Sequence, residues 1–193
     1  MAVDPQFEAR LSQFIDRQFP GSSVGAVDQL TSGASQQTFR VRTRSRDGIQ
    51  RDYALRRAQP GLVASSQGQL STSAEVALLR LAQSASVPVP NVICELEPRH
   101  DLGEGYLMEW LEGETLGHRI VKLPEFAEMR ATLAYECGQT LAKIHALPVP
   151  HSLRRVLPCV SPEVLVRETW DAYIALNTPQ PMIDFTAQWL LSH

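Results

Sequence analysis

The sequence changes its pattern at residues 105–113, which read Gly-Tyr-Leu-Met-Glu-Trp-Leu-Glu-Gly. This stretch begins as an apolar strand and ends in an acidic turn with glycine. The segments before it are predicted to be mostly strands and loops, whereas those after it have the apolar periodicity of helices. A strand at such a boundary is a natural hinge between two lobes, and small ligands commonly bind in clefts between lobes. Taken alone, the stretch favours a simpler interpretation, an ordinary sheet strand followed by a Glu-Gly turn.

The part of the chain before this boundary is predicted to alternate between strands and single helices. Four apolar residues near the start recur at helical spacing and predict an amphipathic helix over residues 6–18, namely Phe7, Leu11, Phe14 and Ile15. A second helix is predicted over residues 73–83, and strands over residues 24–30, 38–43, 53–57 and 92–96. The hinge stretch adds a fifth strand.

The part of the chain after the boundary is predicted to be helical almost to its end. Helices are expected over residues 115–120, 125–147, 162–176 and 182–192. In the long helix, an apolar stripe is formed by Leu133, Cys137, Leu141 and Ile144. The domain boundary is therefore predicted between residues 1–112 and residues 113–193.

The composition excludes several classes of protein. With 193 residues, 44% of them hydrophobic and 20% charged, the chain can bury a core of its own. A formal net charge of −3 argues against a nucleic-acid partner. No apolar run approaches the ~20 residues that span a bilayer. The start of the chain is not a secretory signal, and the histidines lack metal-ligand spacing. Cys94, Cys137 and Cys159 form no CxxC pair, so we expect a reduced, cytoplasmic setting without a membrane partner.

The first two candidate site features lie on the predicted hairpin and on the strand after it. Residues 32–37 form a turn rich in Gly and Ser, which can bring backbone N–H groups close to phosphate oxygens. Taken alone, it is more simply a hairpin turn. In the third strand, alternation places Ala54 and Arg56 on one face, which leaves room for a flat ring beside a phosphate-binding cation. The alternative is a solvated arginine on an edge strand.

The other two features are a helix carboxylate and the hinge itself. Glu75 shares a face with Leu78, Leu79 and Ala82, and a carboxylate on an apolar face needs a partner, for which Arg56 is the candidate. Equally, Glu75 can be a charge that interacts with the helix dipole. The hinge can offer backbone groups to an adenine edge, with Met108 at the back of the pocket.

These four features occur in the order of a protein-kinase-like amino-terminal lobe. The chain resembles the aminoglycoside phosphotransferase family of that superfamily, and within it the phosphotransferase-like domains related to those fused to acyl-CoA dehydrogenases. The resemblance is carried by residues 32–39, 53–61, 87–90, 106–113 and 141–147.

The resemblance implies a fold and a set of site residues. The fold class is α+β: an amino-terminal lobe with a five-stranded antiparallel sheet and a helix, followed by the first helices of a helical carboxy-terminal lobe. Arg56 would contact phosphate where the family commonly has lysine, a replacement that is not neutral, and Glu75 would hold Arg56 in place. The other implied nucleotide-binding residues are Ser32, Gly33, Ala34, Ser35 and Gln36 at the phosphates, and Ala54, Met108, Glu109, Trp110 and Leu111 around the base.

The chain also departs from the family pattern. It contains no His-Gly-Asp motif, which carries the family's chemistry. Ile183-Asp184-Phe185 is similar to the family's metal-binding motif, but Asp184 falls in the first turn of a predicted helix, where capping explains it better. We therefore expect a chain that stops before the catalytic loop, with no catalytic or metal residue of its own. Mg²⁺ is expected only in the complete protein.

The predicted function is ATP- or GTP-dependent phosphoryl transfer to the hydroxyl of a small molecule whose identity the sequence leaves open, by a chain that is inactive alone. Apolar surface should be exposed on the long helix and the last two helices, with a tendency to self-associate. The alternative is a non-catalytic nucleotide-binding or protein-interaction module. RNA binding through Arg40, Arg42 and Arg44 is disfavoured, because no aromatic residues are interleaved with them.

Overall fold

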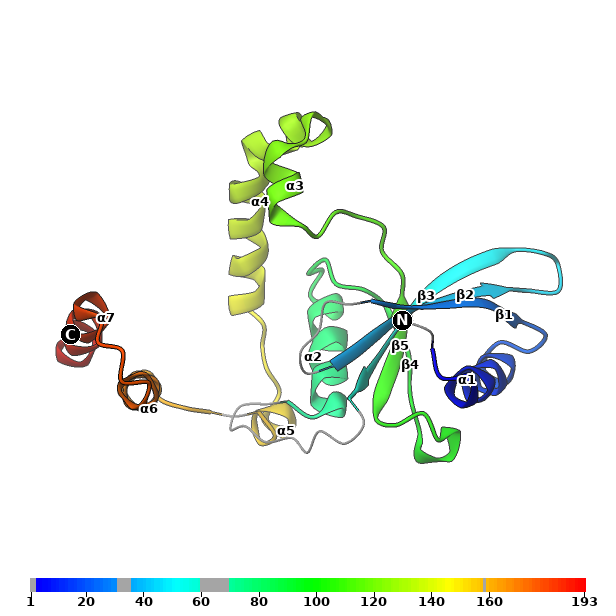
Figure 1. Ribbon diagram of the computed structural model, residues 1–193, viewed down its shortest axis with the longest axis horizontal. Helices are drawn as coiled ribbons and strands as arrows, with labels where there is room; N and C mark the ends of the chain where they lie inside the picture. Colours follow the sequence, from blue (N-terminus) through cyan, green and yellow to red (C-terminus); the bar gives the residue numbers. More distant parts are fainter. Residues whose placement is uncertain (1–2, 31–35, 60–69, 158) are drawn as a thin grey trace. The chain divides into compact units, whose positions relative to one another are not determined.

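The computed structural model describes residues 3–30, 36–59, 70–157 and 159–193 (Figure 1). The chain divides into two compact units, Met1–Leu153 and Arg154–His193. In chain order the elements are α1 (Pro5–Gln18), β1 (Ser23–Leu30), β2 (Gln36–Arg44), β3 (Gln50–Ala58), α2 (Thr72–Ser84), β4 (Val92–Glu95), β5 (Gly105–Glu109), α3 (Gly117–Lys122), α4 (Ala127–His145), α5 (His151–Arg154), α6 (Pro162–Ala175) and α7 (Pro181–Ser192). Short 3₁₀ turns lie at Pro98–His100 and Pro124–Phe126.

The first unit is built on a five-stranded sheet with the strand order β1-β2-β3-β5-β4. Every neighbouring pair is antiparallel. The predicted α+β fold, with a five-stranded antiparallel sheet followed by helices, is confirmed. Strands β3 and β5 lie inside the sheet, so residues on them are held by neighbours on both sides.

Helix α1 covers one face of this sheet and supplies much of the core. Asp4 caps the helix by accepting a hydrogen bond from the Gln6 amide at 3.1 Å, and Pro5 occupies the first turn. The four apolar residues that predicted this helix are all at most 2% exposed, and they pack with Phe39, Leu55 and Leu107 of the sheet. Alternation in β2 is as predicted, because Phe39 and Val41 are buried whereas Arg40 and Arg42 lie on the opposite face.

Strands β3 and β5 approach each other closely at one glycine. A Cβ atom on Gly105 would lie 2.4 Å from the carbonyl oxygen of Arg56 and 2.9 Å from the Cα atom of Arg57. Only a residue without a side chain fits there unless the strands shift. Gly105 therefore helps to set the register in which Arg56 faces Tyr106.

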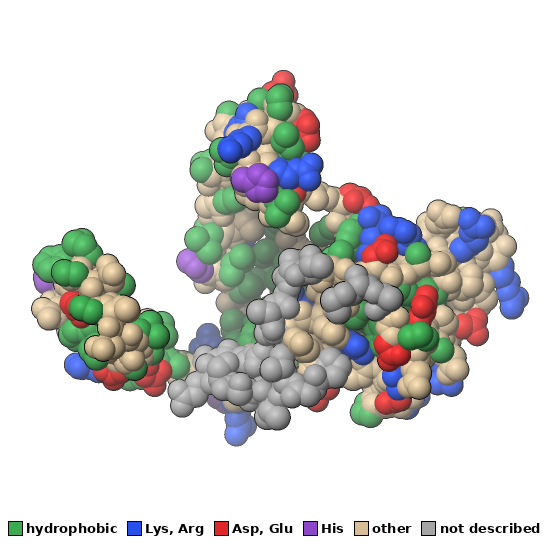
Figure 2. All heavy atoms as spheres, in the orientation of Figure 1, with side chains coloured by type: hydrophobic (Ala, Val, Ile, Leu, Met, Phe, Trp, Pro, Cys, Tyr) green, Lys and Arg blue, Asp and Glu red, His purple; other side chains and the backbone are tan. Residues whose placement is uncertain are grey.

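The helices after the hinge form where the sequence predicts them, with the addition of the short helix α5. Helix α4 has no buried residue, and its Leu141 and Ile144 are 51% and 44% exposed. Exposed apolar residues also occur on α6 and α7 (Figure 2), among them Leu165, Ile174, Phe185, Trp189 and Leu190. The predicted exposure of apolar surface on these three helices is confirmed.

The second unit is a pair of helices joined by an indole–carboxylate hydrogen bond. Ser161 caps α6, and Trp170 Nε1 donates to Asp184 Oδ1 at 2.9 Å. Asp184 lies in the first turn of α7, as predicted, but the capping position is Gln180 rather than Asp184. The Asp184 amide donates to the Gln180 carbonyl within its own helix, and its carboxylate accepts from Trp170 of α6.

Candidate functional site

Arg56, Glu75 and Gln36 form one polar network on the sheet face opposite α1. Arg56 Nη2 lies 3.0 Å from Glu75 Oε1, and Gln36 Nε2 donates to Glu75 Oε2 at 3.3 Å. Arg56 Nε in turn donates to Gln36 Oε1. The Arg56 and Glu75 side chains are 39% and 22% exposed. Arg56 is therefore the partner of Glu75, as expected from the sequence. Its guanidinium is oriented by two acceptors and still reaches solvent.

Local sequence explains why these groups meet. Ser71 caps α2 by accepting from the Ala74 amide at 3.2 Å, which fixes Glu75 in the first turn of that helix. Helix α2 contacts β4 and β5. Arg56 lies opposite Thr38 on β2 and Tyr106 on β5. The network thus joins two strands to one helix.

Tyr106 belongs to this group and was not predicted from the sequence. It is 2% exposed and lies on β5 directly opposite Arg56 of β3. The pKa of its hydroxyl is raised to about 12, mainly by burial and then by the negative charge of Glu75, whereas Arg56 acts to lower it. Alternation in the hinge strand, which places Tyr106 and Met108 on one face, is the signal that could have identified it.

Ala54 and Met108 continue the same face of the sheet. They are opposite each other in the pairing of β3 with β5, two residues along from the pair formed by Arg56 and Tyr106. Ala54 is buried and Met108 is half-buried. The predicted sharing of one face by Ala54 and Arg56 is confirmed, and the face grades from apolar at Met108 to charged at Arg56.

At the hinge, one backbone amide is hydrogen-bonded and another has no partner among the described residues. The Glu109 amide donates to the Asn91 carbonyl at 2.9 Å. Leu111 is 59% exposed, and within the described ranges no hydrogen bond from its amide is found. The predicted backbone donor at Leu111 is therefore available to a ligand.

A second polar cluster, which we call the hinge clamp, consists of Arg40, Asp52, Trp110 and Glu112. Arg40 Nε donates to Asp52 Oδ2 and Arg40 Nη2 to Glu112 Oε1, both at 2.7 Å. The Arg40 guanidinium carbon lies 4.5 Å from the centre of the Trp110 ring. The hydrogen bond to Asp52 is the main cause that raises the pKa of Arg40.

The hinge clamp was missed by sequence reasoning. Arg40 does have an aromatic partner, Trp110, which comes from the hinge rather than from the strand that carries Arg40. The Trp110 side chain faces the clamp, since its Nε1 donates to Glu112 Oε1 at 2.8 Å. The available signal was that Arg40, Asp52 and Ala54 fall on one face by alternation.

Ser32, Gly33, Ala34 and Ser35 lie outside the described residues. Gln36 and Gln37 are the described members of the predicted phosphate-binding turn, residues 32–37. In the part of the chain that the structure describes, no group of three or more His, Cys, Asp or Glu residues could hold a metal ion. No described helix is long and apolar enough to cross a membrane.

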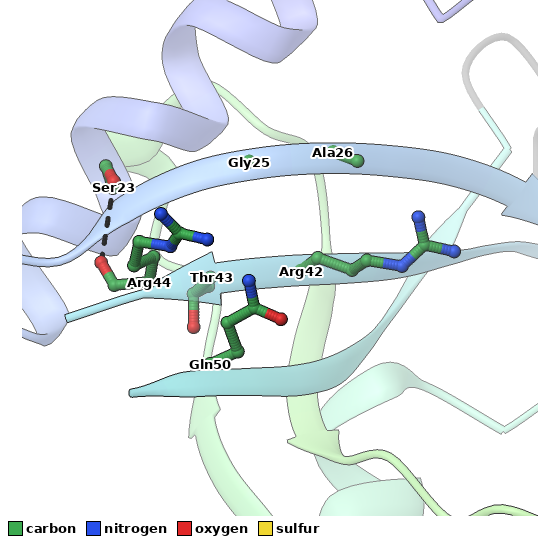
Figure 3. A pocket seen from close by; sticks show the side chains of 7 residues that line it. All are labelled: Ser23, Gly25, Ala26, Arg42, Thr43, Arg44 and Gln50. Carbon is green, nitrogen blue, oxygen red and sulfur yellow. Dashed lines mark hydrogen bonds between the residues drawn. The ribbon is translucent and has the colours of Figure 1, made fainter. Parts of the chain in front are cut away.

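A separate hollow of about 430 Å³ lies at the other end of the first three strands (Figure 3). It is lined by Ser23, Gly25, Ala26, Arg42, Thr43, Arg44 and Gln50. Figure 3 shows the Arg42 and Arg44 side chains extending from β2 along its edge. Arg42 is already paired with Asp28 at 2.9 Å. Gln50 and Arg56 are six positions apart on β3, about 20 Å along a strand, so this hollow is distinct from the candidate site.

Comparison with known proteins gives one match. A model of the phosphotransferase enzyme family (APH) matches residues 26–191, which run from β1 to α7 and include every described residue of the candidate site. No curated protein and no solved structure matches the chain.

Proposed function

This chain belongs to the phosphotransferase enzyme family, and we propose that it binds ATP or GTP on the sheet face that carries Arg56 and Met108. The observation that carries the proposal is the Arg56–Glu75–Gln36 network. Such a network holds a cation in one orientation on the same face as the apolar residues Ala54 and Met108, and the hinge with its backbone donor follows the same strand, β5. In phosphoryl transfer, this site would hold the nucleotide whose phosphoryl group passes to the hydroxyl of a small molecule.

Arg56 is proposed to bind the nucleotide phosphates. A guanidinium has five N–H donors in a planar fork. Gln36 accepts from Nε and Glu75 lies against Nη2, so further donors remain for phosphate oxygens. Charge-assisted bonds of this kind are among the strongest that a partly exposed site can make. Ser32, Gly33, Ala34 and Ser35 precede Gln36 directly and are proposed to add backbone N–H groups.

The base is proposed to lie against Ala54 and Met108, with its edge at the hinge. The Leu111 amide would donate to a ring nitrogen, and the Glu109 carbonyl would accept from an exocyclic or ring N–H group. Trp110 contributes through its backbone, because its ring and its N–H group are occupied by Arg40 and Glu112.

Catalysis is proposed to need more than these residues. Phosphoryl transfer requires a base for the acceptor hydroxyl and ligands for a divalent metal. The sequence has no His-Gly-Asp motif, and Asp184 is held by Trp170. We therefore expect nucleotide binding without turnover by this chain. The non-catalytic alternative, a nucleotide-binding or interaction module, uses the same site.

Three further assignments, of subfamily, location and self-association, are part of the proposal. Likeness to the domains related to those fused to acyl-CoA dehydrogenases depends on the sequence motifs alone. A cytoplasmic location is supported by the free thiols of Cys94, Cys137 and Cys159. Self-association is supported by the exposed apolar residues of α4, α6 and α7.

Calorimetric titration with ATP and with GTP, each with Mg²⁺, tests the proposal. Arg56→Met should weaken the binding of the preferred nucleotide at least about tenfold, the effect of losing one charge-assisted contact. The matched control is Arg42→Met, on β2 and paired at the surface with Asp28, which should leave the affinity unchanged. Absence of binding to both nucleotides, or equal affinities for wild type and Arg56→Met, would refute the proposed site.

A further inference from the structure

The hinge clamp joins three segments through one guanidinium. Arg40 comes from β2, Asp52 from β3, and Trp110 and Glu112 from the hinge. Arg40 contacts Asp52 Oδ2 through both Nε at 2.7 Å and Nη2 at 2.5 Å. Two contacts from one fork to a carboxylate fix the plane of the guanidinium as well as its position.

The fixed guanidinium then holds the hinge in two ways. Its Nη2 donates to Glu112 Oε1, and its face lies 4.5 Å from the centre of the Trp110 ring, within the range of a cation–π interaction. Trp110 Nε1 also donates to Glu112 Oε1. Arg40, Trp110 and Glu112 therefore form a closed set of three mutual contacts.

Leu111 lies between the two held residues. Trp110 and Glu112 flank it in the sequence, and both side chains are anchored to the sheet through Arg40. The Leu111 side chain itself is exposed, and within the described part of the chain its amide has no hydrogen bond. The clamp thus holds the backbone on both sides of an open donor.

We propose that Arg40 is a positioning residue that presents the Leu111 amide to the nucleobase. The inference rests on the proposed nucleotide site and adds a role that acts on the base rather than on the phosphates. A donor already held in its binding geometry loses less conformational freedom when the ligand arrives, so the clamp should raise affinity through preorganisation.

A clamp that only stabilised the fold would lower the melting temperature when it is broken. Glu112 is 73% exposed, and exposed ion pairs contribute little to the stability of a fold. Loosening the contact of Glu112 with Arg40, as in Glu112→Gln, should therefore change the melting temperature little while it weakens ligands that contact the hinge. Ligands without a base should bind with unchanged affinity.

The test compares ATP with inorganic tripolyphosphate, which has the phosphates but no base. Arg40→Met should raise the Kd for ATP about tenfold and leave the Kd for tripolyphosphate within about twofold. Arg56→Met should weaken both ligands. Glu112→Gln, a surface change that retains the contacts between Arg40 and Asp52, should raise the Kd for ATP about threefold, and it provides the readout if Arg40→Met does not fold. Arg42→Met is the matched control.

The outcomes separate the two proposals. Wild-type protein that binds neither ATP nor GTP overturns both. Wild-type protein that binds ATP with an affinity unchanged by Arg40→Met and Glu112→Gln overturns the clamp proposal alone. Equal weakening of ATP and tripolyphosphate by Arg40→Met also overturns it, because the loss would then reflect charge or folding rather than the position of the hinge.

Discussion

Helices α1 and α4 carry the same kind of sequence pattern but have opposite environments. The apolar residues of α1 are at most 2% exposed and form the core with the sheet. In α4 no residue is buried, and the apolar stripe predicted from the sequence is open. Periodicity therefore predicts that a helix forms, because that depends on local spacing. Burial depends on a partner surface, which α1 finds on the sheet.

The same substitutions should consequently have different effects in the two regions. The strongest contrast is between core and exposed leucines. Leu107→Ala, in β5 at 0% exposure, should lower the free energy of unfolding by about 3 kcal/mol, since it removes buried methyl groups and leaves a cavity. Leu141→Ala in α4 should change it by less than about 0.5 kcal/mol.

Urea denaturation followed by circular dichroism measures both values. A loss above about 2 kcal/mol for Leu141→Ala would show that α4 is covered in solution, and would remove the contrast between the two helices.

Replacing two glycines by alanine should change the free energy of unfolding in opposite directions. Gly105→Ala places a Cβ atom 2.4 Å from the Arg56 carbonyl oxygen, so the strands must move apart, at a cost of about 2 kcal/mol. Gly138→Ala, within α4 with nothing within 4 Å of the added atom, should stabilise the protein by about 0.8 kcal/mol because alanine favours the helix. Midpoints of urea unfolding give both values, and changes of the same sign would contradict the different packing of the two positions.

Titration of Tyr106 should make the stability of the first unit, which contains the sheet, depend on pH. Its pKa rises from 10.0 to about 12 on folding, so above pH 10 the unfolded chain loses a proton that the folded chain keeps. Stability should then fall as the pH rises from 10 to 12, by about 1.4 kcal/mol at pH 11.

Denaturant titrations at pH 8 and pH 11 compare wild type with Tyr106→Phe. The decrease between the two pH values should be smaller in the variant by about this 1.4 kcal/mol. Identical decreases in both proteins would show that Tyr106 does not titrate in this window.

The smallest effect is expected in the second unit, where the hydrogen bond between Trp170 and Asp184 joins α6 to α7. Asp184→Ala removes the acceptor of Trp170 Nε1 and should lower the protection of α7 amides from hydrogen exchange by about 1 kcal/mol. Asp171→Ala, at an exposed position of α6, is the control and should leave that protection unchanged. Equal protection in wild type and Asp184→Ala would mean that apolar contacts alone hold α6 to α7.

The elements of the fold could be predicted because their signals are local. Alternation identified the buried face of β2, and the helical spacing of four apolar residues identified α1 together with its buried side. The ion pair of Arg56 with Glu75 could also be anticipated, because a carboxylate on an apolar helix face needs a partner. The four-residue helix α5 gave no periodic signal of its own.

The remaining parts of the site depend on register and on helix starts, which a single sequence does not determine. Tyr106 joins the network through its pairing with Arg56, fifty positions earlier in the chain, and through its interaction with Glu75. Arg40 meets Trp110 across seventy positions. Asp184 lies in the first turn of α7 as predicted, but the start of that helix at Pro181 places the carboxylate beyond the capping position.

The pairing of β3 with β5 also restricts how a chain of this kind can change over evolution. Adjacent residues Leu55 and Arg56 point to opposite faces, one into the core and one into the polar network. A one-residue deletion in β3 would exchange the two faces, burying the guanidinium and exposing the leucine. Descendants of this chain can therefore alter the site by replacing residues one at a time, whereas insertions and deletions are confined to the segments outside the paired strands.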